Sequence, residues 1–144
     1  MSYIRIWVHC VWGTKRRESF ITNENKKIII EHIRENAKQK GIYIDFINGY
    51  KEHLHCLISL NHDQNISKVM QLLKGESSFW INKNNIAEGT FEWADEYFAV
   101  SVGESTVNRV RDYIKNQEKH HSNKTWEEEY NEFINKYGFK KIKG

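Results

Sequence analysis

The chain has 144 residues, of which 39% are hydrophobic and 13% aromatic, and its formal net charge is +3. A chain of this length usually forms one domain, and this composition can close a hydrophobic core, so intrinsic disorder is a poor interpretation. We expect a single domain over residues 1–144, with a core over about 3–121 and a variable tail helix over about 125–137.

Cysteine usage and hydropathy indicate a cytoplasmic protein. Cys10 and Cys56 lie in separate apolar runs, which suits buried thiols in a reducing compartment better than a disulfide framework. No stretch approaches the ~20 apolar residues that cross a bilayer, and the N-terminus lacks the apolar segment of a signal peptide. We therefore expect no membrane association.

The first half of the chain reads as strand, helix and two further strands. Residues 4–13 alternate with a period of two and are rich in β-branched and aromatic residues, which predicts a strand. Apolar residues at helical spacing over 22–41 predict a helix. Strand-like residues 42–47 then lead through Asn48-Gly49, a hairpin signal, into a strand over 53–60, so these two strands should be antiparallel neighbours.

The second half adds a helix, a strand and two more helices. Helical periodicity covers about 66–82, a strand pattern covers 97–103, and a third helix is expected over about 104–121. A capping-box pattern over 125–128 begins the last helix. The order βαββαβ predicts an α+β, ferredoxin-like fold, in which a four-stranded antiparallel sheet carries helices on one face, followed by a C-terminal helix and a tail helix.

Two histidines stand next to each other on one face of the strand over 53–60. In a strand His53 and His55 point to the same side while Leu54 points to the other, so Leu54 can enter the core and the imidazoles can share the opposite, open face. Paired imidazoles at this spacing can bind one divalent metal ion. They can equally be polar residues of a half-exposed strand.

A metal site would need a third ligand, and several residues are candidates by type alone. They are His9 on the first strand and the pair His120 and His121 in the third helix. Glu52 is also of the right type, although strand alternation places it on the side opposite His53.

The third helix carries a tyrosine and a glutamine four residues apart. Tyr113 and Gln117 therefore lie on one helical face, at the edge of the apolar stripe, where a side chain can reach a cleft. The alternative is that Tyr113 is an ordinary boundary residue, with one end of its ring buried and the other solvated.

Taken together, these motifs resemble a known family. The chain is similar, over about residues 3–121, to the small IS200/IS605-type transposases, the single-tyrosine (Y1) members of the HUH endonucleases, which include the REP-associated tyrosine transposases. The motifs that carry the resemblance occur in the family's order: VWGTKRRESF (11–20), EHLHCLISL (52–60), ISKVMQLLKGESSFW (66–80), YFAVSVG (97–103) and YIKNQ (113–117).

The resemblance implies an activity, a site and a set of partners. Such enzymes act as homodimers that cleave and rejoin single-stranded DNA at hairpin-bearing ends of mobile elements, and their sites are often assembled from two chains. His53, His55 and Gln117 would hold Mg²⁺ or Mn²⁺, and Tyr113 would be the nucleophile that forms a 5′-phosphotyrosine. Two imidazoles and an amide oxygen suit Mn²⁺ better than Mg²⁺. Whether Tyr113 acts on its own subunit's site is left open.

Basic residues near these motifs are candidate contacts to DNA phosphates. Lys15, Arg16 and Arg17 directly follow the first predicted strand, and Arg109 and Lys115 flank the tyrosine in the third helix. Cations beside aromatic residues are typical of proteins that bind single strands. Arg109 or Lys115 could also favour the ionised form of the tyrosine.

Three alternatives remain at the level of the sequence. A non-catalytic ferredoxin-like module could bind single-stranded nucleic acid, but it would need aromatics on an open sheet face and has no use for the His-x-His and Tyr-x-x-x-Gln motifs. A domesticated relative could cleave DNA without moving an element. A structural zinc site that includes Cys56 is less favoured, because Cys56 points away from the histidine face.

Overall fold

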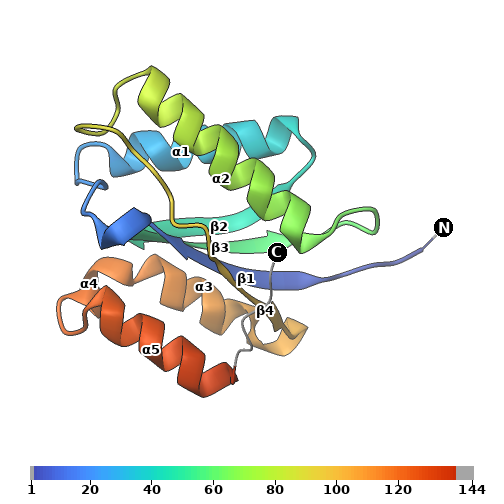
Figure 1. The fold of residues 1–144 in the computed structure, drawn as a ribbon. Helices are drawn as coiled ribbons and strands as arrows, with labels where there is room; N and C mark the ends of the chain where they lie inside the picture. Colours follow the sequence, from blue (N-terminus) through green and yellow to red (C-terminus); the bar gives the residue numbers. More distant parts are fainter. Residues whose placement is uncertain (1, 139–144) are drawn as a thin grey trace.

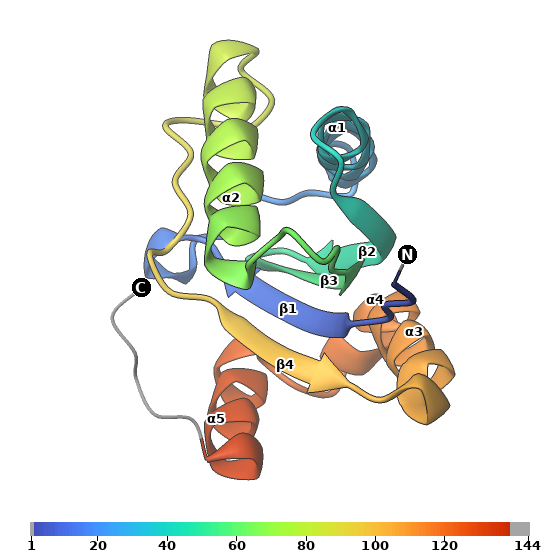
Figure 2. The same ribbon diagram turned by 90° about the vertical axis from the view of Figure 1, so that its right-hand side faces the viewer.

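The computed structural model describes residues 2–138, and its centre is a four-stranded antiparallel sheet between two layers of helices (Figures 1 and 2). The strands lie in the order β2-β3-β1-β4, so β3 and β1 are the two central strands. This is the predicted α+β, ferredoxin-like arrangement. The strands are β1 (Trp7–Gly13), β2 (Tyr43–Tyr50), β3 (His53–Ser59) and β4 (Phe98–Val102).

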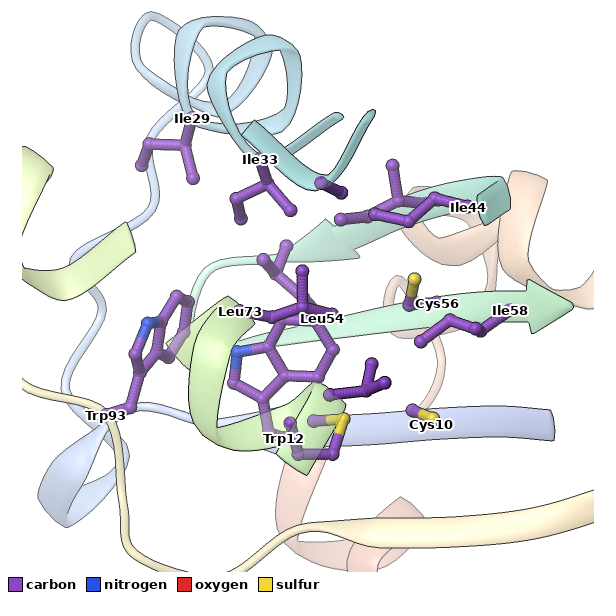
Figure 3. Close-up of a cluster of buried hydrophobic side chains, with 14 of the residues drawn as sticks. Cys10, Trp12, Ile29, Ile33, Ile44, Leu54, Cys56, Ile58, Leu73 and Trp93 are labelled. Carbon is purple, nitrogen blue, oxygen red and sulfur yellow. The ribbon is translucent and has the colours of Figure 1, made fainter. Parts of the chain in front are cut away.

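One face of the sheet packs against α1 (Lys26–Gln39) and α2 (Ile66–Lys83), which lie side by side above it in both views (Figures 1 and 2). Every second residue of β1 and β3 enters this main core, including Trp12 and Leu54 (Figure 3). Both predicted helices are thus confirmed, and their apolar stripes face the sheet.

The other face is covered as well, and here the expectation of an open histidine face is wrong. After the short 3-10 turn η2 (Glu104–Thr106), the chain forms α3 (Val107–Lys115), α4 (Gln117–His121) and α5 (Trp126–Tyr137), which lie below the sheet (Figure 2). Periodicity showed an apolar stripe on the third helix, but not which sheet face it covers. Apolar contacts fix α3 there: Val107 and Ile114 pack with Trp7 and Leu57.

The predicted third helix is broken rather than continuous. Asn116 has φ −96° and ψ 29°, which ends α3 and begins α4. At the other end of the chain, α1 begins at Lys26 rather than Thr22. Thr22 and Asn25 form reciprocal hydrogen bonds, with Thr22 N–H donating to Asn25 Oδ1 (2.7 Å) and Asn25 N–H to Thr22 Oγ1 (3.1 Å), so a turn precedes the helix.

The hairpin between β2 and β3 turns later than predicted. Asn48 and Gly49 lie within β2, and the turn is formed by Lys51 and Glu52. Gly49 is opposite Leu54, and a Cβ at this glycine would lie 2.2 Å from the carbonyl oxygen of His53. The glycine is therefore needed for close approach of two backbones, not for a two-residue turn.

The cysteines are buried free thiols, as predicted. Cys10 and Cys56 are opposite each other in the β1–β3 register and face the main core (Figure 3). Burial raises the pKa of both thiols. Within residues 2–138 no helix combines the length and apolar character that a membrane span requires.

Alanine substitutions at Gly49 and Gly75 should change the free energy of unfolding in opposite directions. Gly49→Ala should lower the free energy of unfolding by roughly 2–3 kcal/mol, because its Cβ meets backbone that cannot move away. Gly75→Ala, in the middle of α2 with nothing within 4 Å of the added carbon, should raise it by about 0.5–1 kcal/mol. Urea denaturation measures both, and equal effects of the two substitutions would contradict the assignment of Gly49 to a close backbone contact.

Candidate active site

The histidine pair lies at the centre of the buried lower face of the sheet. His53 and His55 project from β3 toward α4 and α5, and both side chains are 0% exposed. Leu54 and Cys56 point into the main core on the opposite side, as strand alternation requires. The backbone of the central strand therefore holds both imidazoles in fixed positions.

The Nδ1 atom of each imidazole has its own partner. His53 Nδ1 is 3.1 Å from Glu52 Oε1, and His55 Nδ1 is 2.9 Å from His9 Nε2. The prediction that Glu52 points to the side of the strand opposite His53 is wrong. Glu52 lies in the turn before β3, where strand alternation does not apply. Burial and the neighbouring His55 lower the pKa of His9 to about 3, so His9 is neutral and its Nε2 can accept a hydrogen bond from His55 Nδ1–H. His9 thus supports His55 and does not reach the point where the other ligands meet.

Gln117 is the third residue of the candidate set, and the structure brings it to the pair. Its Oε1 is 3.0 Å from His53 Nε2, and its Nε2 donates to the carbonyl oxygen of Tyr113 (3.2 Å). The second bond fixes the orientation of the amide, so the oxygen is the atom that faces the imidazole. Although the helix breaks at Asn116, the i, i+4 relation between Tyr113 and Gln117 persists.

Tyr113 reaches the same point from within the same chain. Its ring centroid lies 5.4 Å from that of His55, and its hydroxyl donates a short hydrogen bond to Glu129 Oε2. The hydroxyl is also 3.4 Å from His120 Nε2. Burial and the Glu129 carboxylate raise the pKa of Tyr113 well above its ordinary value, so the phenol is protonated in this arrangement.

Glu129 is a functional candidate that sequence reasoning missed. Its carboxylate is 1% exposed, and its Oε1 is 3.2 Å from Nε2 of His53, His55 and His121 alike. Its Oε2 is 3.1 Å from Nε2 of His120. The two histidines of α4 therefore contact this carboxylate. A sequence signal did exist, because Glu129 falls at helical spacing between Trp126 and Phe133, inside the buried stripe of α5.

The pKa values of the cluster are set by two opposing effects, the burial of each group and the charges and hydrogen bonds around it. Burial raises the pKa of Glu129, but hydrogen bonds with His121, His53 and His55 outweigh it and hold this pKa far below its usual range. Burial lowers the pKa of His55 to about 4 against the pull of the carboxylate. Burial also acts on His53, but its bonds to Glu129 and Glu52 prevail, so its pKa is raised.

The donor set fits a divalent cation. With the protons of His53 and His55 on Nδ1, their Nε2 lone pairs point inward, toward the Gln117 amide oxygen and the Glu129 carboxylate. Candidate ligand atoms of His53, His55 and Glu129 lie within 4.8 Å of one another. Nitrogen and oxygen acceptors that converge in this way, backed by Glu52 and His9, have the form of a metal site with its supporting hydrogen bonds.

Comparison with known proteins identifies the family. Residues 2–117 match the family profile described as "Transposase IS200 like", which covers most of the chain and every residue of the candidate set up to Gln117. The chain belongs to the IS200-like transposase family. It is thus related to metal-dependent enzymes that cleave and recombine DNA.

Individual relatives agree with this assignment. The chain is 25% identical over 114 residues to the ISDra2 transposase TnpA of Deinococcus radiodurans, a match that covers 76% of this chain and 81% of that protein. It is also 25% identical over 115 residues to the transposase for insertion sequence element IS200 of Salmonella typhimurium, which covers 76% and 74% of the two chains.

Two solved structures share the fold. One is a crystal structure of a transposase candidate from Deinococcus radiodurans, with a TM-score of 0.64 and 22% identity over 81% of this chain and 93% of that one. The other is a REP-associated tyrosine transposase bound to a REP hairpin, with a TM-score of 0.61 and 17% identity over 84% and 72%. Both likenesses support the ferredoxin-like sheet with its added helices.

The tail helix α5 follows the part of the chain that matches the family profile, and it closes the site. Trp126 stacks on the His53 ring with centroids 4.2 Å apart and planes at 6°. Phe133 lies 6.0 Å from the His55 ring. Gly13 makes room for this packing, since a Cβ there would lie 3.1 Å from the indole nitrogen of Trp126. The predicted capping box is present at Thr125 and starts the helix.

The basic residues after β1 form the 3-10 turn η1 (Lys15–Arg17) beside α5. Arg17 pairs with Glu127 (3.5 Å), and its guanidinium lies 5.2 Å from the Tyr130 ring centroid. Lys15 pairs with Glu92 (2.8 Å), and Arg16 is exposed. The other two candidates, Arg109 and Lys115, are exposed on α3.

Removal of the Trp126 ring should loosen α5 locally. Trp126→Ala takes away a buried indole, and a local cost of roughly 3 kcal/mol corresponds to about 100-fold faster amide exchange in α5. Hydrogen–deuterium exchange measured by mass spectrometry tests this, with α1 as the internal reference. The matched control is Phe79→Ala on α2, whose ring is 67% exposed. Unchanged exchange in α5 would show that the stacked indole does not hold this helix.

Proposed function

We propose that this protein is a transposase that cleaves and rejoins single-stranded DNA at the ends of a mobile element through a 5′-phosphotyrosine intermediate. Tyr113 is the nucleophile, and His53, His55 and Gln117 hold a divalent cation. The observation that supports this most directly is the position of the Tyr113 phenol, which lies beside the converging imidazoles within one chain. The family assignment supports the general reaction, and the geometry supports the choice of these residues.

The cation would be Mg²⁺ or Mn²⁺, and the imidazole nitrogens favour Mn²⁺. When bound, it would supply a positive charge that polarises and orients the scissile phosphate. The hydrogen bonds of Glu52 and His9 to the two Nδ1 atoms favour the tautomers of His53 and His55 whose inward Nε2 atoms would bind the cation.

The chain also supplies groups that can accept the proton of the phenol. As Tyr113 attacks phosphorus, its proton must leave, and two acceptors contact the hydroxyl: Glu129 Oε2 and His120 Nε2. The P–O bond to the 3′-oxygen of the preceding nucleotide breaks, and that oxygen takes up a proton to leave as a 3′-hydroxyl, which balances the proton lost by Tyr113. The phosphotyrosine conserves the energy of the broken bond, so another 3′-hydroxyl can reverse the step and join strands without ATP.

DNA is positioned by the basic residues around the site. We assign phosphate contacts to Lys15, Arg16 and Arg17 in η1 and to Arg109 and Lys115 on α3, since all five side chains reach the surface. A DNA hairpin as partner is supported by the solved REP-associated relative, which is bound to one. The sheet face that a ferredoxin-like binding module would use is covered by α3, α4 and α5, which disfavours the non-catalytic alternative.

The nucleophile acts on the site of its own subunit in this proposal, and a homodimer remains part of it on the strength of the family resemblance. Tyr113 contacts the cluster in cis, so one chain contains the phenol and all three proposed cation ligands. A dimer would therefore hold two complete sites.

The nucleophile can be tested with a labelled single strand that carries the element end, taken from the DNA that flanks the gene. With Mn²⁺, the wild-type protein should form a denaturation-resistant protein–DNA conjugate, and Tyr113→Phe should form at least about 1,000-fold less, because it lacks the hydroxyl oxygen that bonds to phosphorus in the proposed reaction. Tyr43→Phe, on an exposed ring of β2, is the matched control. A conjugate of normal yield with Tyr113→Phe would refute the assignment.

The cis arrangement is tested by mixing inactive subunits. Tyr113→Phe and His55→Ala chains, each carrying a different affinity tag, are co-expressed and the mixed species is purified. A site built in cis is damaged in both chains, so no conjugate should form. Recovery of cleavage in the mixed dimer would show instead that the tyrosine helix exchanges between subunits.

A further inference from the structure

We propose that Glu129 is a fourth protein ligand of the divalent cation, supplied by the tail helix α5. The inference rests on the proposed function and deepens it, since it extends the ligand set of the same site beyond the part of the chain that matches the family. It is carried by the distances between candidate ligand atoms and by the positions of the protons around them.

The distances are those of ligands that share one ion. Atoms bound at about 2.1 Å from a common cation lie about 3.0–3.4 Å from each other in octahedral or tetrahedral geometry. Glu129 Oε1 is 3.2 Å from Nε2 of both His53 and His55, and His53 Nε2 is 3.0 Å from Gln117 Oε1. The carboxylate oxygen therefore stands at about the same distance from His53 Nε2 as the amide oxygen of Gln117 does, and it is equally close to His55 Nε2.

The hydrogen-bond partners of the histidines also favour a cation between these atoms. His121 Nδ1 is 2.7 Å from the carbonyl oxygen of Lys124, which can only accept, so this nitrogen carries the proton. His53 is placed likewise by the carboxylate of Glu52. In their neutral forms both rings direct Nε2 lone pairs at Glu129 Oε1, which is itself an acceptor. Without a cation, imidazoles must carry a second proton to donate to this carboxylate oxygen, and a bound cation would take the place of such protons.

The second carboxylate oxygen has other partners. Glu129 Oε2 accepts from the Tyr113 hydroxyl and lies 3.1 Å from His120 Nε2, which leaves Oε1 to face the ligand set. Trp126 and Phe133 pack on either side along α5, so the carboxylate is held in place by a buried helical stripe. Glu129 would thus link the bound ion to the nucleophile through its two oxygens.

Metal affinity, measured without DNA, tests this ligand. Mn²⁺ is titrated into the metal-free full chain and the free ion is followed by electron paramagnetic resonance, for the wild-type protein, Glu129→Gln, His55→Ala and the matched control Glu132→Gln. Glu132 lies on the same helix but is exposed and pairs with Lys124. Loss of one ligand should weaken Mn²⁺ binding by about tenfold or more in Glu129→Gln, while Glu132→Gln should bind as the wild type does. Circular dichroism of the metal-free proteins identifies any variant that has lost its helices. If Glu129→Gln has done so, Glu129→Asp is the second test. It keeps the charge but has a shorter side chain, so it should also bind Mn²⁺ more weakly than the wild type.

The outcomes separate this inference from the function on which it rests. Unchanged or tighter binding by Glu129→Gln, with binding lost in His55→Ala, would overturn the carboxylate ligand and leave the histidine site standing; it would mean that Glu129 occupies the place of the ion and is bonded by protonated imidazoles. Equal affinity in His55→Ala and the wild type, or no binding by the wild type, would remove the metal site of the proposed function itself.

Discussion

The structure depends on one buried carboxylate among imidazoles. Glu129, 1% exposed, brings α5 against β3 through His53 and His55 and against α4 through His120 and His121. Removing a carboxylate from water costs several kcal/mol, and this cost is recovered only where charge or hydrogen bonds compensate it closely. Each histidine that contacts Glu129 therefore helps to dock the tail helix, whatever part it has in the proposed chemistry. Loss of the compensating groups would leave an unpaired charge in the interior, which no amount of apolar contact along α5 offsets cheaply.

The sheet makes this arrangement possible because each of its two central strands directs apolar side chains to one face and the histidines to the other. On β3, Leu54 and Cys56 enter the apolar core under α1 and α2, while His53 and His55 face the opposite layer. Packing on one side thus fixes the backbone that carries the imidazoles on the other. The neighbouring strand adds His9, which is opposite Leu57 in the register, and its ring lies 5.2 Å from that of His55. Adjacent strands thus contribute a candidate ligand and its hydrogen-bond partner as diagonal neighbours.

Local patterns predicted the parts of the site that depend on spacing. Alternation along β3 placed His53 and His55 on one face, and helical spacing placed Tyr113 beside Gln117; both relations hold, even across the helix break at Asn116. The order of strands and helices was also readable, because periodicity is a local property.

Features that depend on tertiary packing could not be predicted from the sequence. The burial of the histidine face follows from where α3 and α5 dock, and the contact of Glu52 with His53 follows from the exact position of the turn. Glu129 is one of three consecutive glutamates, Glu127 to Glu129. Its spacing with Trp126 and Phe133 places it on the apolar stripe of α5, but only the docking of α5 shows that this stripe faces the histidines.

The helix that covers the site also affects how DNA would bind in the proposed reaction. There a phosphodiester contacts Tyr113 and the imidazoles, and Trp126, Glu129 and Phe133 of α5 lie on that side of the cluster. Beside them, Arg17 of η1 pairs with Glu127 of α5. A DNA phosphate bound by Arg17 would replace that carboxylate, so the free energy of the Arg17–Glu127 pair is subtracted from the affinity for DNA.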